Sequence, residues 1–577
     1  MKILGISAFY HDAAAALIDD GEIVAAAQEE RFTRVKHDGG FPYHSISFVL
    51  AAEGLTLADV DHVALYWNPF NLAHRARYMA ETLLRNPALF AEKARRALTV
   101  WRGAAGESSG WGGLFKVPGN LRRRFGPGPR VRFLDHHECH MASCFFPSGF
   151  EEAAILVMDG AGEAACTTWG RGRGTTVESI DEHRLPHSLG HYYAAVTGFL
   201  GFKMLDGEYK VMGLSPYGDP GGARWIRESF LRRDGPGRYT LAPGVLDYHR
   251  ALRGRFDGAF AERFGPPRAA SEAAEFGDRH RDIAASAQAA FEEAVLEMAG
   301  ELRRRTGLSR LAVAGGCGLN CTANGKILRA GIFEEIYVPP VPHDSGGALG
   351  AAMLLHTQLT GRRPERLDHA QLGPAFDEGS IRAALGGRPD LCAEKLDEGR
   401  LLSRAAETLA GGGVLAWFQG PMEYGPRALG NRSFLADPRS DAIRDTINEK
   451  IKKRELFRPF APSVKAEKAG DYFDISQPSP FMTIIVPVRP DKRAVIPAVT
   501  HVDGTARPQT VDRGANPRYW GLLDRFEALT GVPVLLNTSF NIQEPIVCTP
   551  QDALATFTRS RVDALAIGDF WVTRAEG

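Results

Sequence analysis

Short apolar segments separated by polar turns open the chain. Three of them read as β-strands: Lys2–Ala8, Ala13–Ile18 and Glu22–Gln28. The step Asp19-Asp20-Gly21 between the last two is a strong β-hairpin signal, because Asp-Gly favours the tight turn that joins antiparallel strands. A similar unit recurs where Ala154–Met158 and Ala164–Gly170 flank a turn of small residues. The pattern therefore predicts an internal duplication of a β-hairpin unit.

Apolar strands then alternate with helical patterns. Further predicted strands are Val131–Leu134, Leu311–Ala314 and Glu335–Val338. A long amphipathic helix is expected from about 276 to 306, because apolar residues recur there on one helical stripe. That stripe comprises Ile283, Ala287, Phe291, Val295 and Met298. Residues from about 70 to 130 read as a helical insertion that ends in a Gly/Arg/Pro-rich loop. Together these elements predict an α/β fold.

Chain length implies more than one domain. The chain has 577 residues, whereas single hydrophobic cores stop growing near ~250–300 residues. A stretch rich in Arg, Pro and Gly over about 359–380 is the predicted linker. It separates a first domain over 1–358 from a second, mixed α/β domain over 381–577. Strand candidates in the second domain are Gly413–Phe418, Met482–Val488 and Val532–Leu536.

Composition excludes several classes of partner. The 69 basic and 69 acidic residues balance, so no global charge attracts nucleic acid or an anionic membrane. Seven cysteines, scattered and odd in number, form no disulfide framework and fit a reducing cytoplasm. The start of the chain reads as a strand rather than a signal peptide, and no apolar run reaches transmembrane length. The chain is expected to be a soluble cytoplasmic enzyme.

The segment Asp135-His136-His137-Glu138-Cys139-His140 carries the most specific chemical signal. It follows a predicted strand and reads as the start of a helix, so His136 and His140 project from one face and can hold one metal ion. Asp159 stands at the carboxyl end of the next strand, where open α/β sheets bind ligands. Packed core histidines remain the alternative for a His pair alone. The mixed His/carboxylate set suits iron, zinc or manganese better than a structural zinc cage.

Gly-rich turns after successive strands predict a nucleotide pocket. Their residues are Gly160, Gly162, Glu163, Gly315, Gly316, Asn320 and Gly346. Glycine lets the backbone approach a ligand closely, and the helices that follow these turns can bind an anion at their N-termini. A lone Gly-Gly is usually only a turn, but a succession of them beside a metal favours nucleotide or acyl-phosphate chemistry.

Cations in the second domain form another candidate site. No Walker-type Gly-x-x-x-x-Gly-Lys-Ser/Thr motif is present, so phosphates would be held by the planar fork of Arg or the point charge of Lys. Arg427, Arg458 and Arg507 stand among Gly, Pro, Phe and Thr, where a charge needs a partner. We expect these three to bind ligand. Their neighbours Lys450, Lys453 and Arg454 read as a solvated helix face.

Several long motifs, in one order along the whole chain, give a resemblance to a known family. They are Leu4–Leu17, Glu29–Arg34, Asp135–His140, Met158–Glu163, Gly207–Gly218, Gly315–Asn320, Tyr424–Ser433 and Leu536–Asn541. The chain resembles the O-carbamoyltransferases of the nodulation-protein NodU and cephem-carbamoylating CmcH type. Members of that family carbamoylate sugars, aminoglycosides, β-lactams and macrolide-like scaffolds, which places many of them in antibiotic biosynthesis.

The resemblance implies a two-domain, ATP-dependent carbamoyltransferase. Its first domain would have the actin-like (ASKHA) fold of the tRNA threonylcarbamoyl-transferring enzymes, and its second the YrdC-like fold. Carbamoyl phosphate and ATP, with Mg²⁺, would give carbamoyl-adenylate in the second domain. The first domain would then pass the carbamoyl group to a hydroxyl of a small-molecule acceptor. Oligomeric state is not readable, and a homodimer remains open.

Site residues follow from the same resemblance. The metal ligands would be His136, His140, Asp159 and Asp344, with Fe²⁺ as the first choice and Zn²⁺ or Mn²⁺ as alternatives. The carbamoyl-phosphate and ATP pocket would use Arg427, Lys452, Arg458, Arg507, Arg513, Asn537 and Ser539. An attacking alcohol must lose a proton, so a general base is expected. His11 beside Asp12 is the candidate, with a turn-shaping role as its alternative, and Lys210 would border the acceptor pocket.

Other functions stay open at this point. A tRNA-modifying threonylcarbamoyl transferase would share the fold and the metal site, but the balanced charge offers no obvious basic stripe for RNA. A hydrogenase-maturation carbamoyltransferase is disfavoured because no Cys-x-x-Cys pair occurs. A non-catalytic, actin-like ATP-binding regulator would explain the repeated hairpins, but neither the second domain nor the His/Asp set.

Overall fold

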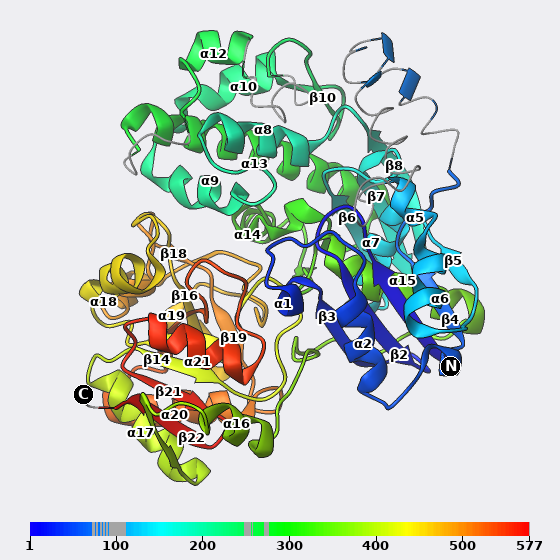
Figure 1. Ribbon diagram of the computed structural model, residues 1–577. Helices are drawn as coiled ribbons and strands as arrows, with labels where there is room; N and C mark the ends of the chain where they lie inside the picture. The colour runs from blue at the N-terminus through cyan, green and yellow to red at the C-terminus, as the bar shows by residue number, and fades with distance from the viewer. Residues whose placement is uncertain are drawn as a thin grey trace. The chain divides into compact units, whose positions relative to one another are not determined.

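The computed structural model describes residues 1–71, 76, 79–80, 83–84, 87, 90–91, 111–246, 256, 258–269 and 276–575. Packing divides the chain into two compact units. The N-terminal unit comprises Met1–Glu29 and His37–Leu367, and the C-terminal unit comprises Glu30–Lys36 and Asp368–Gly577. Both mix helices and strands, so the predicted α/β class is confirmed (Figure 1). Within the described ranges, no helix is both long and apolar enough to cross a membrane.

Two five-stranded sheets in the N-terminal unit share one strand order. The first runs β3-β2-β1-β4-β5 and the second β8-β7-β6-β11-β12. In each, three antiparallel strands are followed by two parallel ones. The first sheet contains β1 (Lys2–Ser7), β2 (Ala14–Asp19), β3 (Glu22–Gln28), β4 (His62–Leu65) and β5 (Val131–Phe133). The second contains β6 (Glu152–Met158), β7 (Ala165–Arg173), β8 (Thr176–Arg184), β11 (Arg310–Ala314) and β12 (Glu335–Tyr337). The predicted duplication of the hairpin unit is therefore confirmed.

The first hairpin turns as its sequence predicts. Asp20 and Gly21 join β2 to β3, and both have positive φ, 49° and 93°. Positive φ at both central residues defines the type I′ turn, whose twist matches that of the flanking strands. The Asp-Gly step thus fixes the register in which Asp19 faces Glu22.

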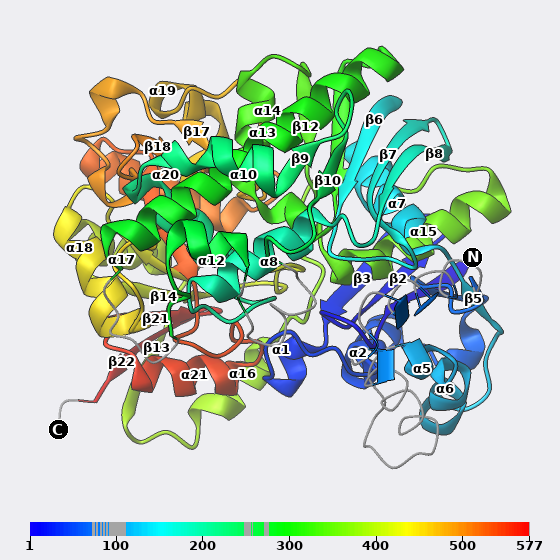
Figure 2. The ribbon, with the colours of Figure 1, turned by 90° about the horizontal axis from the view of Figure 1, so that it is seen from above.

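Two central helices pack between the sheets. Helix α7 (His136–Phe145) follows β5 and packs against β6, β7, β8 and β11, whereas α15 (Asp344–Thr360) follows β12 and packs against β1, β2 and β4. The helices also pack against each other, and Figures 1 and 2 show them side by side. A Cβ at Gly350 would lie 2.0 Å from the carbonyl oxygen of Cys139. The helices therefore approach this closely only because residue 350 is glycine.

Other helices cover the outer parts of the N-terminal unit. Helix α2 (Tyr43–Ala51) packs against β2 and β3, and the predicted long helix is α13 (Asp278–Thr306), which packs against β6. All five residues of the predicted apolar stripe in α13 are buried. Around it lie α8 (Leu189–Phe199), α9 (Glu208–Leu214), α10 (Ala223–Ser229), α12 (Ala259–Phe264), α14 (Cys321–Arg329), β9 (Leu231–Arg233) and β10 (Tyr239–Leu241). The predicted insertion over about 70–130 falls largely outside the described residues, apart from α5 (Trp111–Leu114) and α6 (Val117–Phe125).

The C-terminal unit is built on one eight-stranded mixed sheet. Its order is β13-β22-β21-β14-β15-β20-β16-β19. The strands are β13 (Leu391–Lys395), β14 (Leu415–Phe418), β15 (Arg432–Ala436), β16 (Ala461–Lys465), β19 (Gln509–Val511), β20 (Val534–Ser539), β21 (Ala564–Ile567) and β22 (Phe570–Arg574). The two predicted strands over Gly413–Phe418 and Val532–Leu536 correspond to β14 and β20.

The third strand prediction in this unit is confirmed only at its C-terminal end. Of Met482–Val488, β17 (Val486–Pro487) pairs with β18 (Thr505–Ala506), and Val488 forms an isolated antiparallel bridge with Phe473. Met482 adopts φ 55°, which interrupts extended backbone, and Pro487 lacks the N–H that a ladder requires. Phe481, Met482 and Ile484 are nevertheless buried. Their apolar character reflects core packing from an irregular segment.

Helices pack around this sheet. Helix α17 (Glu398–Ala410) packs against β14 and against α20 (Pro517–Thr530), which also packs against β16 and β20. Helix α21 (Pro550–Arg559) packs against β21 and against α16 (Glu378–Leu385). Shorter elements are α18 (Asp441–Thr446), α19 (Ala469–Tyr472) and the π-helix η6 (Ile447–Lys452).

Residues 30–36, including α1 (Glu30–Thr33), belong to the C-terminal unit although they lie early in the chain. Phe32 packs against a buried cluster of Met422, Ile546 and Cys548. Arg34 donates to the carbonyl oxygens of Ile546 at 2.7 Å and Pro545 at 2.6 Å. The hydrophobic pattern does not predict that residues 30–36 pack in the C-terminal unit, because their partners are hundreds of residues away in sequence.

Candidate active site

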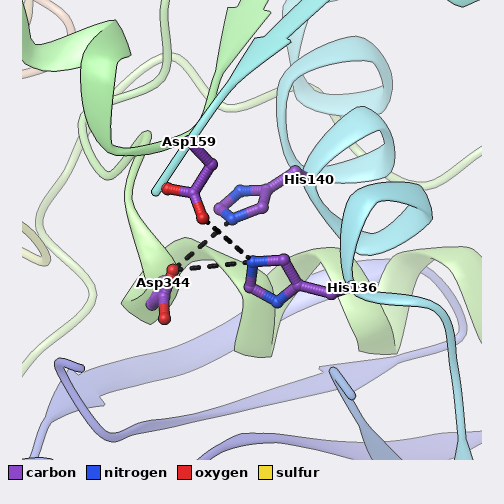
Figure 3. A group of neighbouring side chains, drawn as sticks. All are labelled: His136, His140, Asp159 and Asp344. Atoms are coloured by element: carbon purple, nitrogen blue, oxygen red, sulfur yellow. Dashed lines mark hydrogen bonds and ion pairs between the residues drawn. The ribbon is translucent and has the colours of Figure 1, made fainter. Parts of the chain in front are cut away.

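The four predicted metal ligands converge in the N-terminal unit (Figure 3). His136 and His140 lie one turn apart on α7, Asp159 follows β6, and Asp344 is the first residue of α15. One donor atom from each lies within 4.8 Å of the others. All four side chains are buried, both imidazoles completely.

The repeated fold explains this convergence. Each central helix follows the fifth strand of its own sheet, and His136 and Asp344 are the first residues of those two helices. Asp135 fixes the start of α7 by accepting hydrogen bonds from the backbone N–H groups of His137 at 3.0 Å and Glu138 at 3.2 Å. Such an N-cap is what Asp supplies at a helix start. Two equivalent helix starts therefore meet at one point.

Distances in this cluster suit a shared cation. His136 Nε2 lies 3.3 Å from Asp159 Oδ2 and 3.7 Å from Asp344 Oδ1, and His140 Nε2 lies 3.6 Å from Asp344 Oδ1. These separations exceed those of good hydrogen bonds. They approach the spacing of two ligands that are each about 2.0–2.2 Å from one ion. Among the described residues, His140 Nε2 is buried without a hydrogen-bond partner.

Electrostatics at the cluster favour positive charge. Burial opposes the charged form of His136, but the carboxylates of Asp159 and Asp344 outweigh it and raise its pKa to about 9. Burial likewise opposes ionisation of Asp159, yet His136 and His140 hold its pKa well below the ordinary value. His137 is separate: its Nδ1 contacts Thr168 Oγ1 at 2.7 Å, and burial lowers its pKa. Two imidazoles with two carboxylates fit a first-row divalent metal.

Backbone and hydroxyl donors orient the two carboxylates. Asp159 Oδ1 accepts from the N–H of Gly316 at 2.8 Å, and Asp344 Oδ2 accepts from the hydroxyl of Tyr66 at 3.3 Å. Hydrogen bonds of this kind fix metal-binding carboxylates in place. Gly315 allows the first of them, because it has φ 85° and a Cβ there would lie 2.2 Å from the carbonyl oxygen of Met158.

Three other glycines predicted for nucleotide binding lie in different local surroundings. Gly160 accepts from Ser188 Oγ at 2.7 Å, and a Cβ at Gly162 would lie 3.2 Å from the His136 ring. Gly162 therefore borders the His/Asp cluster, and Gly160 directly follows its member Asp159 in the chain. Gly346 lies in the first turn of α15 and bonds back to the carbonyl oxygen of His343 at 2.8 Å.

The two polar residues predicted for nucleotide binding form hydrogen bonds within the protein. Glu163 accepts from the backbone N–H groups of His136 at 3.2 Å and Asn68 at 2.7 Å, and burial raises its pKa to about 7. Asn320 caps α14 by accepting from the N–H of Ala323 at 3.1 Å, and it exchanges 3.0 Å hydrogen bonds with Gln288. Both side chains stabilise the turns that carry the glycines.

A second histidine cluster surrounds Asp12, which has φ 53°. Its Oδ2 lies 2.6 Å from His11 Nδ1 and 3.0 Å from His343 Nδ1, and its Oδ1 lies 2.8 Å from His37 Nδ1. These are hydrogen-bond distances, unlike those of the metal cluster. Burial opposes the charge of His11, but Asp12 outweighs it and raises the pKa of His11 to about 9.

One segment of the N-terminal unit contacts the other side of these imidazoles. His11 Nε2 lies 2.9 Å from the carbonyl oxygen of Leu205, and His37 Nε2 lies 3.1 Å from Asp206 Oδ1. Helix α9 follows this segment and carries Lys210, whose ammonium lies 5.4 Å from the centre of the Phe202 ring. The predicted residues His11, Asp12 and Lys210 are thus neighbours of one loop.

In the C-terminal unit, Lys452 and Ser539 come together. The ammonium of Lys452 donates to the carbonyl oxygen of Ser539, and it lies 3.2 Å from Ser539 Oγ and 2.8 Å from both the carbonyl oxygen and Oδ1 of Asn541. Burial holds the pKa of Lys452 well below its ordinary value, and the positive charges of Arg454 and Arg458 lower it further. A bound anion would offset this electrostatic cost.

Two family models match this chain, one in each half. The carbamoyltransferase N-terminus matches residues 2–353, and the carbamoyltransferase C-terminus matches residues 406–574. The chain belongs to the carbamoyltransferase family. It is a carbamoyltransferase of the NodU and CmcH type, as its motifs predict, and the reading as a non-catalytic regulator is wrong.

Individual relatives agree with this assignment. Nodulation protein NolNO of Sinorhizobium fredii is 40% identical over 98% of this chain and 79% of that protein. The 3'-hydroxymethylcephem-O-carbamoyltransferase of Amycolatopsis lactamdurans is 40% identical over 47% of this chain and 50% of that enzyme.

Among solved structures, HypF of T. kodakarensis aligns with 62% of this carbamoyltransferase and 48% of its own chain, at 15% identity and a TM-score of 0.33.

Three predicted arginines of the carbamoyltransferase lie in the C-terminal unit with different environments. Arg507 Nε is buried and, among the described residues, has no hydrogen-bond partner. Arg458 lies 3.6 Å from Glu455 and close enough to Lys452 to lower its pKa. Arg427 is half-buried in the loop between β14 and β15. All three remain candidates for holding an anion.

The structure places two other predicted residues elsewhere. Arg513 is exposed, and its guanidinium lies 5.0 Å from the centre of the Trp520 ring on α20. Asn537 is only 2% exposed and donates to Ser463 Oγ at 3.0 Å and Gln509 Oε1 at 3.1 Å. Asn537 therefore bonds to side chains within the sheet.

Sequence reasoning missed several residues of these clusters. His37, His343 and Asp206 complete the group around His11 and Asp12, and Asn541 completes the cage around Lys452. Only the long motif around Asn541 offered a signal. The others meet through long-range packing, for which a single sequence gives no spacing rule.

Proposed function

We propose that this carbamoyltransferase makes carbamoyl-adenylate from carbamoyl phosphate and ATP in its C-terminal unit, and transfers the carbamoyl group to an acceptor hydroxyl in its N-terminal unit. The observation that carries the proposal is the pairing of two different sites in one family member. A buried two-His, two-Asp cluster lies in the unit that matches the carbamoyltransferase N-terminus. The caged Lys452 lies in the unit that matches the carbamoyltransferase C-terminus.

Fold assignments belong to the same proposal. The repeated strand order of the two sheets supports an actin-like N-terminal domain over 1–358, the plan expected for a domain that clasps a nucleotide between two hairpin units. The region 381–577 would be the YrdC-like domain, joined by the linker over about 359–380. The glycine turns at the metal cluster would then face the phosphate of the adenylate.

Activation would require several cations because two polyanions meet. Loss of inorganic phosphate from carbamoyl phosphate by hydrolysis gives carbamate, whose oxygen attacks the α-phosphorus of ATP and expels pyrophosphate. Lys452, Arg458 and Arg507 would offset the charge of the phosphates, Arg by its planar fork and Lys as a point charge. The Ser539 hydroxyl beside Lys452 would hydrogen-bond a phosphate oxygen.

Transfer would break the bond between the carbamoyl carbon and the adenylate oxygen, with AMP as the leaving group. His11 Nε2 would take the proton of the acceptor alcohol in the neutral form of the ring, which Asp12 holds through Nδ1; because the pKa of His11 is raised to about 9, transfer should become faster as pH rises toward that value. For this, the acceptor hydroxyl must replace the Leu205 carbonyl as the partner of Nε2. A divalent ion held by His136, His140, Asp159 and Asp344, with Fe²⁺ as first choice, would supply Lewis acidity toward the carbamoyl or phosphate oxygens.

The acceptor is proposed from chemistry shared with relatives. A relative's name, 3'-hydroxymethylcephem-O-carbamoyltransferase, specifies a primary hydroxyl on a small molecule. We propose a hydroxyl of a sugar or natural product as the acceptor class of this chain. Mass spectrometry after incubation with hydroxylated candidates would detect the added carbamoyl group.

Pyrophosphate release tests the activation step. Wild-type protein incubated with carbamoyl phosphate and ATP is expected to release pyrophosphate and form carbamoyl-adenylate, and Arg458→Ala should reduce the rate by about 100-fold or more because a charged phosphate contact is lost. Lys450→Ala is the matched control, since it removes an exposed cation of the same segment and should leave the rate unchanged. Wild-type protein that releases no more pyrophosphate than Arg458→Ala would overturn the proposal.

A further inference from the structure

Buried side chains hold the backbone of the loop that carries Arg427. Glu423 Oε1 accepts from the N–H groups of Leu429 at 2.6 Å, Asn431 at 2.8 Å and Arg432 at 3.3 Å. Glu423 is only 3% exposed. The Glu423 side chain therefore fixes the backbone between Arg427 and the start of β15.

Gln509 is the second buried anchor of this loop, and it also bonds to two neighbouring strands. Its Nε2 donates to the carbonyl oxygen of Leu429 at 2.7 Å. Its Oε1 accepts from Ser463 Oγ at 2.7 Å and from Asn537 Nδ2 at 3.1 Å. Gln509 is 5% exposed, so these bonds are shielded from water and are stronger than surface bonds. One amide thus joins the loop, β16 and β20.

Three of the segments that meet at Gln509, the loop, its own strand and β20, lead to a predicted phosphate contact. Arg427 stands two residues before Leu429, Arg507 two residues before Gln509 itself, and Ser539 two residues after Asn537. Asn537 and Ser539 both belong to β20, where residues two apart share one face. Because of this spacing, the side chains of Asn537 and Ser539 are neighbours on the same face of β20.

Burial makes this arrangement informative. A buried amide is costly unless it is hydrogen-bonded, and an apolar residue of similar volume would fill the same space without that requirement. A polar residue here gives the three segments one fixed relative placement, which packing of apolar side chains specifies less sharply. Misplacing a substrate-holding group by about 1 Å can cost about 100-fold in rate.

We propose that Gln509 is a positioning residue of the carbamoyl-phosphate site. Its side-chain amide fixes Arg427, Arg507 and Ser539 relative to one another through Leu429, its own strand and Asn537. Asn537 acts in the same network, behind Ser539, and does not contact substrate. This inference rests on the proposed activation of carbamoyl phosphate in the C-terminal unit.

Gln509→Met tests the proposal, because Met keeps the volume and removes all three hydrogen bonds. We expect the KM for carbamoyl phosphate to rise about tenfold or more and the kcat of pyrophosphate release to fall about tenfold or more. Lys465→Met is the matched control in the adjacent strand β16. It removes a buried polar group that pairs with Asp524 at 2.8 Å and Glu527 at 2.6 Å, and its KM should equal that of the wild type.

The possible outcomes distinguish failure of the Gln509 positioning role from failure of the proposed activation of carbamoyl phosphate. An active wild type together with an unchanged KM in Gln509→Met would overturn the positioning role alone. An equal rise of KM in Lys465→Met and Gln509→Met would also overturn it, since general destabilisation would then explain both. Wild-type protein without pyrophosphate release would overturn the proposed function, and this inference with it. Thermal unfolding of each variant shows that the folded protein is compared.

Discussion

Donor-to-acceptor distances distinguish two histidine–aspartate clusters of the N-terminal unit. Around Asp12 the imidazole nitrogens lie 2.6–3.0 Å from the carboxylate, as hydrogen bonds require. Around Asp344 they lie 3.6–3.7 Å away, which leaves room for an ion between them. Residue types are the same in both clusters. The geometry around Asp344 therefore suits a cation, and the hydrogen-bonded geometry around Asp12 fits the proton-transfer role proposed for His11.

A buried histidine outside these clusters should make the stability of the N-terminal unit depend on pH. His183 is 3% exposed and stacks on Tyr239 at a centroid distance of 4.3 Å. Burial, and then the charge of Arg238, lower its pKa to about 4. The unfolded chain, with a His pKa near ~6.5, binds the proton first as pH falls. The contribution of neutral His183 to the free energy of unfolding is thus fully present above about pH 6.5. As pH falls from there to about 4, the free energy of unfolding should decrease by about 3 kcal/mol.

Replacement of this histidine provides the measurement. His183→Phe keeps an aromatic ring against Tyr239 and removes the titrating group. Urea unfolding between pH 4 and 8 should then show a shallower loss of stability than in the wild type, by about 3 kcal/mol over that range. Equal pH dependence in the two proteins would show that His183 is not the responsible group.

At the scale of elements, the contact between α7 and α15 sets the geometry of the His/Asp cluster proposed to bind a metal. The helices contribute His136, His140 and Asp344, and each begins at an equivalent point of a repeated strand order. Gly350 permits their close approach. The sequence predicts the start of a helix at Asp135–His140 after one strand, and a helix after the Gly-rich turn that contains Gly346. It does not predict their mutual distance, which depends on the packing of both sheets.

Gly350→Ala should therefore disturb both stability and metal binding. The added methyl would overlap the carbonyl oxygen of Cys139, 2.0 Å away, so the helices must separate at a cost of about 1–3 kcal/mol. Metal affinity should fall with it, as followed by titration of the metal-free protein. Gly300→Ala in α13 is the control, because nothing lies within 4 Å of its added Cβ. That change should stabilise the protein by about 0.5–1 kcal/mol, and a neutral Gly350→Ala would contradict the packing argument.

At the scale of the whole molecule, the two candidate sites lie in separate units. The His/Asp cluster belongs entirely to the N-terminal unit, and Lys452 and Arg458 belong to the C-terminal unit. Residues 30–36 are the exception to sequence order, because Phe32 and Arg34 are fixed in the C-terminal unit. The half-reactions of the proposed mechanism should thus be separable by mutation.

His140→Ala tests that separation. Loss of one of four ligands should lower metal affinity by at least about 100-fold, since even outer hydrogen-bond partners of metal ligands contribute 10- to 100-fold. The variant should lose carbamoyl transfer but still release pyrophosphate from carbamoyl phosphate and ATP. Arg458→Ala should show the reverse, with normal metal content. Metal analysis and the pyrophosphate assay measure both, and full transfer by a metal-free His140→Ala protein would refute the ligand assignment.

The sequence by itself determined the local elements and the family. Strand patterns, the Asp-Gly hairpin and the His136/His140 spacing depend on neighbours within a few residues, so one sequence suffices to predict them. Tertiary structure alone decided which distant groups meet. His343 beside Asp12, Gln509 beside Leu429, and the buried places of Asn537 and residues 30–36 follow from how sheets and helices pack. Packing brings together groups far apart in the chain, and no local pattern encodes their separation.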